Sequence, residues 1–321
     1  MTEQELAQFL LGVSPPIREV RRLILKVART TLPVLVQGPT GAGKEVVAQA
    51  LHSASDRRGR FVPFNVCAIP EGIFESVLFG HVKGAFTGSQ SDGVGLLTEA
   101  HQGTAFFDEI AMLSVAQQVK LLRAIERQEY RPLGARADCH SDFRVVAASN
   151  ADLHVLAGQG RFRADLVQRL AGVLITVPAL DERTEDIRLL VRHFQSDAVR
   201  RHGRAVEFTE EALQRFEDYP WPGNVRELRL AVERAIVFAD TSRIGPDTIA
   251  HVLRAPQQAR HRQGDVDAAE REEMLRLLEQ EGWNTAILAA RLGIHRATIY
   301  RWMRRLEIEG SSRKVFRRTR S

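Results

Sequence analysis

Short apolar runs alternate with helical patterns along the first part of the chain. The runs lie at 33–38, 103–110, 143–150 and 173–180, and they are rich in β-branched and aromatic residues. The segments between them, such as KEVVAQALH and VAQQVKLLRAIE, place apolar residues at the spacing of an amphipathic helix. Buried strands separated by helices are typical of a parallel sheet with helices on both faces. The pattern therefore predicts an α/β domain over residues 1–180, built on a doubly wound sheet.

The pattern changes after Pro178, where the β-type runs stop. Three segments with a helical period follow, EDIRLLVRHFQSDAVRRHG, TEEALQRFEDY and VRELRLAVERAIVFA, and they predict an all-helical domain over 181–253. Residues 254–266 are polar without a hydrophobic period, which is typical of a linker. Helical patterns resume over 267–309, and a basic segment, 310–321, ends the chain. We expect the linker to separate a C-terminal domain from the rest.

The C-terminal domain has the pattern of a helix-turn-helix. Two short helical segments meet at Gly293, Asn284 can cap the first, and His295 begins the second, which is rich in arginine. This predicts a second helix that enters the major groove of double-stranded DNA, although a solvated basic hairpin has the same pattern. The expected core residues are Leu288, Leu292, Ile294, Ile299 and Leu306. The candidate DNA contacts are His295, Arg296, Thr298, Arg301, Arg304 and Arg305.

Charge and composition narrow the class of protein. The 321 residues carry a formal net charge of +5, but the segment 283–321 alone has ten Lys and Arg against two Glu. A net charge of +8 there leaves −3 for the rest, which favours a polyanion partner for the tail, with 310–321 as a disordered arm that adds phosphate affinity. Two cysteines are too few for a disulfide framework or a zinc site. No apolar run is long enough to span a membrane and the N-terminus is polar, so we expect a cytoplasmic protein.

The first motif with chemistry follows the first predicted strand. GPTGAGKE satisfies G-x-x-x-x-G-K, in which backbone N–H groups cradle phosphate and the lysine reaches the outer phosphates. Its residues are Gly38, Pro39, Thr40, Gly41, Ala42, Gly43, Lys44 and Glu45. Glu45 replaces the Ser or Thr that usually binds Mg²⁺, so we expect the metal to be held through water and a downstream acid. A glycine-rich turn without a ligand is the alternative.

An acidic pair ends the second apolar run. Asp108 and Glu109 follow GTAFF, at the end of a strand where ligands bind in open α/β sheets. Asp108 can hold Mg²⁺, and Glu109 can orient the water that attacks the γ-phosphate. Such a pair alone could be the charge at a helix N-terminus. Its position about 65 residues after the phosphate loop favours ATP hydrolysis.

Five motifs in order, GPTGAGKE, FGHVKGAFTGS, GTAFFDEI, FRADLVQRL and WPGNVREL, carry a resemblance that runs from about Leu11 to the end. The chain resembles the AAA+ activators of sigma-54 RNA polymerase, the bacterial enhancer-binding proteins. The resemblance implies an AAA+ P-loop NTPase whose parallel sheet is flanked by helices, with a helical lid and a Fis-type helix-turn-helix. It also implies ATP hydrolysis in a homo-oligomeric ring, usually a hexamer. Since only about ten residues precede the match, we expect no receiver domain here, and regulation by another protein in trans or by expression level.

The resemblance assigns roles around the nucleotide. It implies that Lys44 binds phosphate, Asp108 organises Mg²⁺ and Glu109 polarises water. Asn65, in FVPFNVCA, matches the asparagine that holds the catalytic glutamate inactive until the ligand state changes.

Further matches concern sensing and the neighbouring subunit. Ser149 and Asn150 occupy the first sensor position, where Thr-Asn is more usual, although Ser149 could simply end a strand. Arg163 and Arg169 match arginine fingers that reach the neighbour's γ-phosphate, although both could be surface arginines of a helix. Arg226 matches the lid arginine that senses nucleotide.

A glycine-framed loop carries an aromatic residue with no obvious packing partner. The residues expected to contact the sigma factor are Gly84, Ala85, Phe86, Thr87, Gly88 and Ser89. Phe86 and Thr87 are those that the family uses for this contact. Val77 and Val82 stand where the family has acids, and Ser89 replaces its final alanine. We expect a working contact, with coupling that differs at the base of the loop.

Three functions remain to be compared. The first is an ATP-dependent activator that binds upstream DNA and remodels sigma-54 RNA polymerase so that the promoter opens. The second is a DNA-binding regulator that acts without sigma-54 and uses the AAA+ module for assembly. The third is a chaperone-like remodeller of other proteins. The intact Lys44, Asp108 and Glu109 argue against the second, and the helix-turn-helix argues against the third.

Overall fold

The computed structural model describes most of the chain, in two compact units, Met1–Ile249 and Ala250–Ser321. The described residues are 1–86, 89–203, 205–253, 274–292, Ile299, Met303 and Ile308. The predicted linker 254–266 and the tail 310–321 lie outside them.

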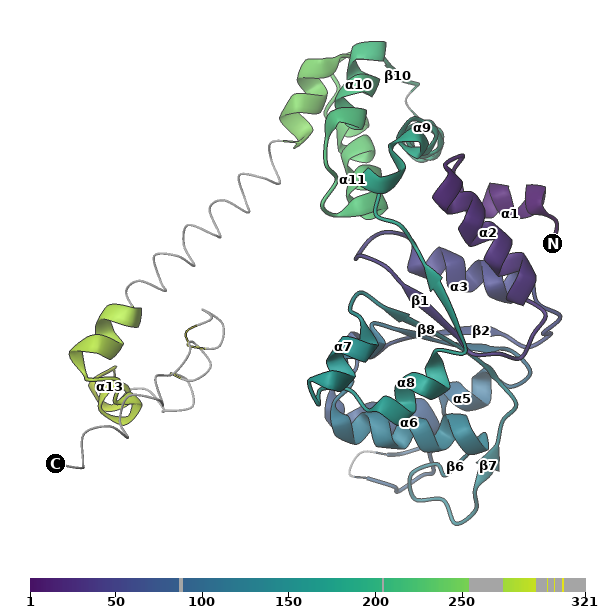
Figure 1. Ribbon diagram of the computed structural model, residues 1–321, viewed down its shortest axis with the longest axis vertical. Helices are drawn as coiled ribbons and strands as arrows, with labels where there is room; N and C mark the ends of the chain where they lie inside the picture. The colour runs from purple at the N-terminus through teal and green to yellow at the C-terminus, as the bar shows by residue number, and fades with distance from the viewer. Residues whose placement is uncertain are drawn as a thin grey trace. The chain divides into compact units, whose positions relative to one another are not determined.

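The first unit is built on a five-stranded parallel sheet (Figure 1). Its strands, in spatial order, are β2 (Phe61–Asn65), β5 (Thr104–Asp108), β8 (Arg144–Ser149), β1 (Val34–Gln37) and β9 (Val173–Thr176). Four of them are the predicted apolar runs. The fifth, β2, was not predicted, because Pro63 interrupts it and only alternate residues are buried. It lies at the sheet edge, where proline is tolerated.

Helices cover both faces of this sheet, as a doubly wound fold requires. One face packs against α1 (Glu3–Phe9), α2 (Pro15–Val27) and α3 (Lys44–Ser53). The other packs against α4 (Phe74–Phe79), α5 (Leu96–Glu99), α6 (Val115–Arg127), α7 (Leu153–Gly158) and α8 (Ala164–Leu170). The two cores are separated by the sheet, so successive strand residues such as Phe106 and Phe107 belong to opposite cores.

Two short antiparallel pairs stand apart from the main sheet. They are β3 (Gly80–His81) with β4 (Gly93–Val94), and β6 (Glu129–Tyr130) with β7 (Cys139–His140). The expected sigma-contact loop, residues 84–89, connects the first pair. An isolated bridge joins His81 to Leu133 in the connection of the second pair, and Val82 N–H donates to Leu133 O at 3.0 Å. The two connections are therefore held together at their bases.

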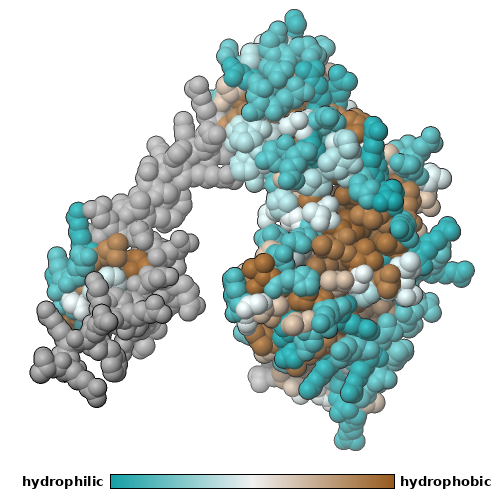
Figure 2. All heavy atoms as spheres, viewed as in Figure 1, coloured by the Kyte–Doolittle hydropathy of each residue, from teal (hydrophilic) through white to brown (hydrophobic). Residues whose placement is uncertain are grey.

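The lid begins with η4 (Asp181–Asp186). It contains α9 (Ile187–His202), α10 (Glu210–Asp218), α11 (Asn224–Val237) and a helical stretch at 246–253. The all-helical prediction was wrong in one detail, since β10 (Glu207–Phe208) pairs in parallel with β11 (Arg243–Ile244). Strands of two residues are too short to show a period in sequence. Trp221 and Phe216 are buried in the lid and stack on each other, while its outer surface is mainly hydrophilic in the view of Figure 2.

In the second unit the described residues are 250–253, which end the helical stretch at 246–253, then 274–292, with a helix over 274–280 and α13 (Thr285–Leu292), and three isolated positions. Ile287 N–H donates to Asn284 Oδ1 at 3.3 Å, which confirms the predicted cap. Leu288 and Ile299 are fully buried with Met274, Leu278, Met303 and Ile308, as predicted for the core. Ile294, Leu306, the side chain of Leu292 and the candidate DNA contacts His295, Arg296, Thr298, Arg301, Arg304 and Arg305 lie outside the described residues.

Within the described ranges, no helix is both apolar and long enough to span a bilayer. This agrees with the absence of a long apolar run in the sequence.

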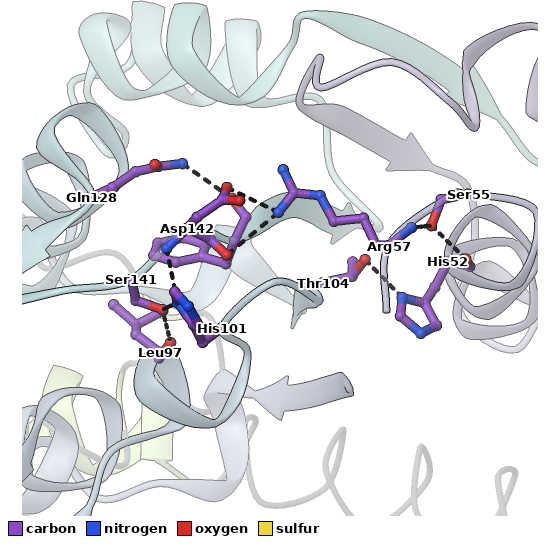
Figure 3. A network of polar contacts seen from close by, with 10 residues as sticks. His52, Ser55, Arg57, Leu97, His101, Thr104, Gln128, Ser141 and Asp142 are labelled. Atoms are coloured by element: carbon purple, nitrogen blue, oxygen red, sulfur yellow. Dashed lines mark hydrogen bonds and ion pairs between the residues drawn. The ribbon is translucent and has the colours of Figure 1, made fainter. Parts of the chain in front are cut away.

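Polar side chains tie the amino edge of the main sheet to its helices (Figure 3). His52 Nδ1, near the end of α3, lies 2.9 Å from Oγ1 of the buried Thr104, which begins β5. Arg57 Nη1 donates to Asp142 Oδ1 at 2.9 Å, and Asp142 N–H donates to His101 Nδ1 at 3.2 Å. The network lies at the opposite edge of the sheet from Asp108, so its role is structural.

We expect His52 to make the first unit less stable in mild acid. Burial, and then the Arg144 guanidinium, lower the pKa of His52. Between that lowered pKa and the ordinary value near 6.5, the unfolded chain binds the proton and the folded chain does not. Stability is therefore lost as the pH falls below about 6.5. Melting temperatures from pH 7.5 to 5.5 should fall less steeply for His52→Gln than for the wild type. The exposed His154→Gln serves as the control, and equal slopes for all three proteins would contradict the assignment.

Candidate active site

A cavity of about 430 Å³ lies between the carboxyl edge of the main sheet and the lid. This volume is in the range of small-molecule sites. Its polar lining comes from the phosphate loop, from the acids Asp108 and Glu109 at the end of β5, and from Arg183, His193, Asp197, Arg226 and Arg229. The apolar lining residues include Phe9, Leu10, Leu11, Leu190 and Phe194. A molecule with an anionic part and a flat apolar part would match these two sets of lining residues.

The phosphate loop turns sharply from β1 into α3. Gly41 and Gly43 have φ of +79° and +109°, values that residues with a side chain rarely adopt. A Cβ on Gly41 would also clash with Gly223 O of the lid, so both the backbone conformation and the close contact require glycine at this position. The helix begins at Lys44, which places its unpaired N–H groups and positive dipole end at the cavity.

Lys44 is folded back onto its own loop. Its Nζ donates to Gly38 O at 2.9 Å and to Pro39 O at 3.2 Å, and only 6% of the residue is exposed. Burial lowers the pKa of Lys44, and the charges of Glu109 and Asp108 oppose that shift. A buried ammonium whose hydrogen-bond partners are carbonyl groups is stabilised when an anion enters the cavity.

The two acids lie at the end of β5, and both line the cavity. Glu109 has φ of +54°, an uncommon backbone for glutamate, and its N–H donates to Asp108 Oδ1 at 3.0 Å. Among the described residues no three His, Cys, Asp or Glu side chains are grouped for a metal ion. Two carboxylates nevertheless fit Mg²⁺, since this ion takes most of its ligands from water and substrate phosphates.

Asn65 ends β2 directly opposite Asp108 in the strand register. Its Oδ1 accepts from Cys67 N–H at 3.0 Å and caps a short 3₁₀ helix, η1 (Val66–Ala68). The structure thus brings Asn65 to the edge of the sheet that carries the acids. Within the described part of the chain, its side chain makes no hydrogen bond to Glu109.

The two sensor candidates differ in what they contact. Ser149 is fully buried, and its Oγ donates to Ala151 O at 2.6 Å and accepts from Ala151 N–H at 3.1 Å. Asn150 Nδ2 instead reaches Thr40 Oγ1 of the phosphate loop at 3.3 Å. The hydroxyl of Ser149 therefore closes the turn after β8, while Asn150 is the one that contacts the loop.

Arg163 and Arg169 lie apart from the cavity, at the beginning and end of α8. Arg163 forms an exposed ion pair with Asp165 at 2.6 Å, which raises the pKa of the guanidinium. Arg169 Nη2 lies 3.5 Å from Ile125 O. Neither arginine is among the residues that line the cavity of its own chain.

Arg226 lines the cavity, and its backbone N–H donates to Gly41 O at 3.2 Å. Two lid residues that sequence reasoning missed, Arg183 and Asn224, also contact the phosphate loop. Asn224 stands inside the quoted WPGNVREL motif, so a signal was present. Arg183 stands in the charged run DERTED, which is typical of a solvated surface and hid its burial.

The loop at 84–89 presents Phe86 with 44% of its surface exposed. Its ring meets His81 edge-on, with 5.1 Å between ring centroids. Ser89 N–H donates to Phe86 O at 3.0 Å, and Ser89 Oγ donates to Val82 O at 3.1 Å. The serine that replaces the usual alanine thus adds a bond that closes the loop. Thr87 and Gly88 lie outside the described residues.

Family models match three parts of the chain. A sigma-54 interaction domain matches residues 10–176, an AAA+ ATPase lid domain matches 181–266, and a homeodomain-like domain matches 265–313.

Curated relatives cover much of the chain. The response regulator protein PilR of Pseudomonas aeruginosa is 40% identical over 89% of this chain and 66% of its own length. The transcriptional regulatory protein ZraR of Klebsiella oxytoca is 41% identical over 93% of this chain and 69% of its own. The DNA-binding transcriptional regulator NtrC of Azospirillum brasilense is 43% identical over 75% and 50%. The chain therefore spans between half and about two thirds of the length of these relatives.

A solved structure agrees with these matches. NtrX from Brucella abortus in complex with ATP is 30% identical, with a TM-score of 0.69, over 95% of this chain and 72% of that one. Its crystal structure in complex with ADP gives the same TM-score.

Proposed function

The chain belongs to the sigma-54 interaction family of AAA+ transcription regulators, and from that premise we propose that it is an ATP-hydrolysing activator of sigma-54 RNA polymerase. The observation that carries the proposal is the cavity, which is lined by the phosphate loop, Asp108, Glu109 and Arg226. We assign ATP to this cavity, with the phosphates at the loop and the base at the apolar end.

The residues of the cavity divide the chemistry between them. Lys44 and the N–H groups at the start of α3 bind the phosphates. Asp108 would hold Mg²⁺, which supplies charge neutralisation on the phosphates when bound. Glu109 accepts a hydrogen bond from the attacking water and orients it toward the γ-phosphate. The lid covers the site and limits the entry of other water molecules.

The catalytic set is complete only in a ring. Arg163 and Arg169 lie away from their own phosphate loop, which supports a contribution of one or both to the site of the next copy. Positive charge at the γ-phosphate stabilises the transition state of phosphoryl transfer. We therefore assign the active form as a homo-oligomeric ring, with a hexamer as the expected size.

The loop at 84–89 is assigned as the contact with the sigma factor. An exposed phenylalanine on a glycine-framed turn is suited to bury its ring in a partner. The C-terminal unit is assigned to upstream double-stranded DNA, which the basic segment 295–308 is predicted to read. Hydrolysis would then move the loop against the bound polymerase.

Truncation of Phe86 tests this assignment. Phe86→Ala is expected to lower activated transcription from a sigma-54 promoter by about tenfold or more, because one buried aromatic can dominate a contact. The rate of ATP hydrolysis should stay within about twofold of the wild-type rate, since the aromatic side chain of Phe86 lies outside the cavity. Thr87→Ala should act in the same direction.

Phe238→Ala is the matched control, because this residue of the lid is 66% exposed and lies outside the loop. Normal activation by both loop variants would remove the loop assignment. If the chain instead activates transcription by the ordinary polymerase, and the loop variants activate it equally well, the result would support the alternative function, a DNA-binding regulator that acts without sigma-54.

A further inference from the structure

Three consecutive carbonyl groups of the phosphate loop accept hydrogen bonds from the segment that begins the lid and from α11. The bonds are Asn224 Nδ2 to Thr40 O at 3.1 Å, Arg226 N–H to Gly41 O at 3.2 Å, and Arg183 Nη2 to Ala42 O at 2.8 Å. No residue of the main sheet or its helices replaces these donors in the described part of the chain. The shape of the loop therefore depends on the lid.

Each bond fixes the orientation of one peptide group. In a trans peptide the N–H points away from the preceding C=O, so a carbonyl held by the lid directs the next N–H away from the donor. The N–H groups of Gly41 and Gly43 are fixed in this way, whereas that of Ala42 donates to Pro39 O at 3.2 Å. A carbonyl turned toward a bound phosphate would repel it, and the lid donors hold three of these carbonyls in hydrogen bonds.

Asn224 bridges the loop and the connection into the lid. It is 4% exposed, and its φ of +53° is a conformation that asparagine tolerates better than most residues. Its Oδ1 accepts from Leu180 N–H at 2.7 Å while its Nδ2 donates to Thr40 O. One amide thus links the residue that precedes η4 to the phosphate loop, and both of its ends are used.

Arg183 is a buried cation on the wall of the cavity. It is 3% exposed, it lines the cavity, and its Nε has no hydrogen-bond partner in the described structure. Burial lowers the pKa of Arg183, and the charges of Asp186 and Glu182 oppose that shift. A buried guanidinium with an unused N–H beside a phosphate site is stabilised when an anion arrives.

We propose that Arg183 and Asn224 are positioning residues, through which the lid holds the phosphate loop in the shape that binds phosphate. The proposal rests on the assignment of ATP to the cavity and goes beyond it, because it makes nucleotide affinity depend on the lid contact. By reciprocity, bound nucleotide stabilises the same contact of the lid with the loop. A change in these lid contacts then alters phosphate binding through the shape of the loop.

ADP affinity of the purified chain tests the proposal. Arg183→Met and Asn224→Asp are each expected to raise the Kd for ADP roughly 3- to 10-fold, the effect of one lost hydrogen bond. Asn224→Asp keeps the size, the tolerated backbone and the acceptor for Leu180 N–H, but it replaces the donor to Thr40 O with a carboxylate oxygen and adds a negative charge. Arg183→Lys keeps one donor and should recover part of the loss. In steady-state hydrolysis, KM for ATP should rise more than kcat falls.

Arg144→Met is the matched control. Arg144 is also buried, with 1% exposed and Nε without a partner among the described residues, but it donates to Val27 O and Ala28 O at the end of α2. Its loss should lower the melting temperature and leave the ADP Kd unchanged. An increase in melting temperature on addition of ADP should persist in Arg144→Met and shrink in Arg183→Met and Asn224→Asp.

The outcomes separate the two proposals. A wild-type chain that binds no ADP contradicts the proposed function. The positioning role is overturned if the wild type binds ADP and the Kd values of Arg183→Met and Asn224→Asp equal that of the wild type or of Arg144→Met. If Arg183→Met does not fold, the isosteric Asn224→Asp decides the question by the same measurement.

Discussion

Glu109→Gln should stop ATP hydrolysis while the protein still binds ATP. Glu109 lies at the carboxyl edge of the sheet, on the cavity wall, with φ of +54° held by the turn after β5. Glutamine keeps the shape but accepts a weaker hydrogen bond from water and cannot take its proton. The loss of a positioned base lowers turnover by about a hundredfold or more. Phosphate release at saturating ATP measures the rate, and a fluorescent ATP analogue measures binding.

Glu99→Gln is the control for this substitution. Glu99 pairs with Arg60 at 2.8 Å, away from the cavity lining, and its replacement should leave hydrolysis unchanged. Hydrolysis by Glu109→Gln at a rate near that of the wild type would show that another group orients the water.

Lys44→Met should remove most of the affinity for ATP and ADP. Its ammonium is buried and donates to Gly38 O and Pro39 O, so it is held at the phosphate loop before any ligand arrives. A charge-assisted bond to phosphate contributes enough that its loss should raise the Kd roughly 10- to 100-fold. Titration of the folded variant with ADP in a calorimeter checks this.

The same substitution should not unfold the chain. Burial lowers the pKa of Lys44, which means that the charged form is disfavoured in the folded protein, so an apolar side chain of similar length is tolerated. Lys120→Met, on α6, breaks an exposed pair with Glu75 of α4; it is the control and should bind ADP normally. Unchanged ADP affinity in Lys44→Met would place the phosphates elsewhere.

Much of the fold followed from hydrophobic periodicity. Strands buried on both faces, such as β8, read as continuous apolar runs, and all six of its residues are buried. The edge strand β2 alternates and contains Pro63, so the same rule missed it. The pair β10 and β11 is too short for any periodic signal.

The phosphate loop and the acids could be placed together because parallel strands end at one edge of a sheet. The lid contacts could not, because Arg183 and Asn224 meet the loop across 141 and 184 residues of chain. A local pattern gives no register between such distant segments. Ser149 shows that a matching residue type does not give the contact. Its hydroxyl suited the sensor position in the sequence, but in the structure it closes the turn after β8.

Promoter opening in purified components tests the central claim most directly. Sigma-54 RNA polymerase is bound to a promoter that carries an upstream site for this chain, and unpaired thymines are detected by permanganate. The account predicts opening with the wild type and ATP, none with a non-hydrolysable ATP analogue, and none with Glu109→Gln and ATP. A wild type that hydrolyses ATP and leaves the promoter closed, or a promoter that opens equally with Glu109→Gln, would contradict it.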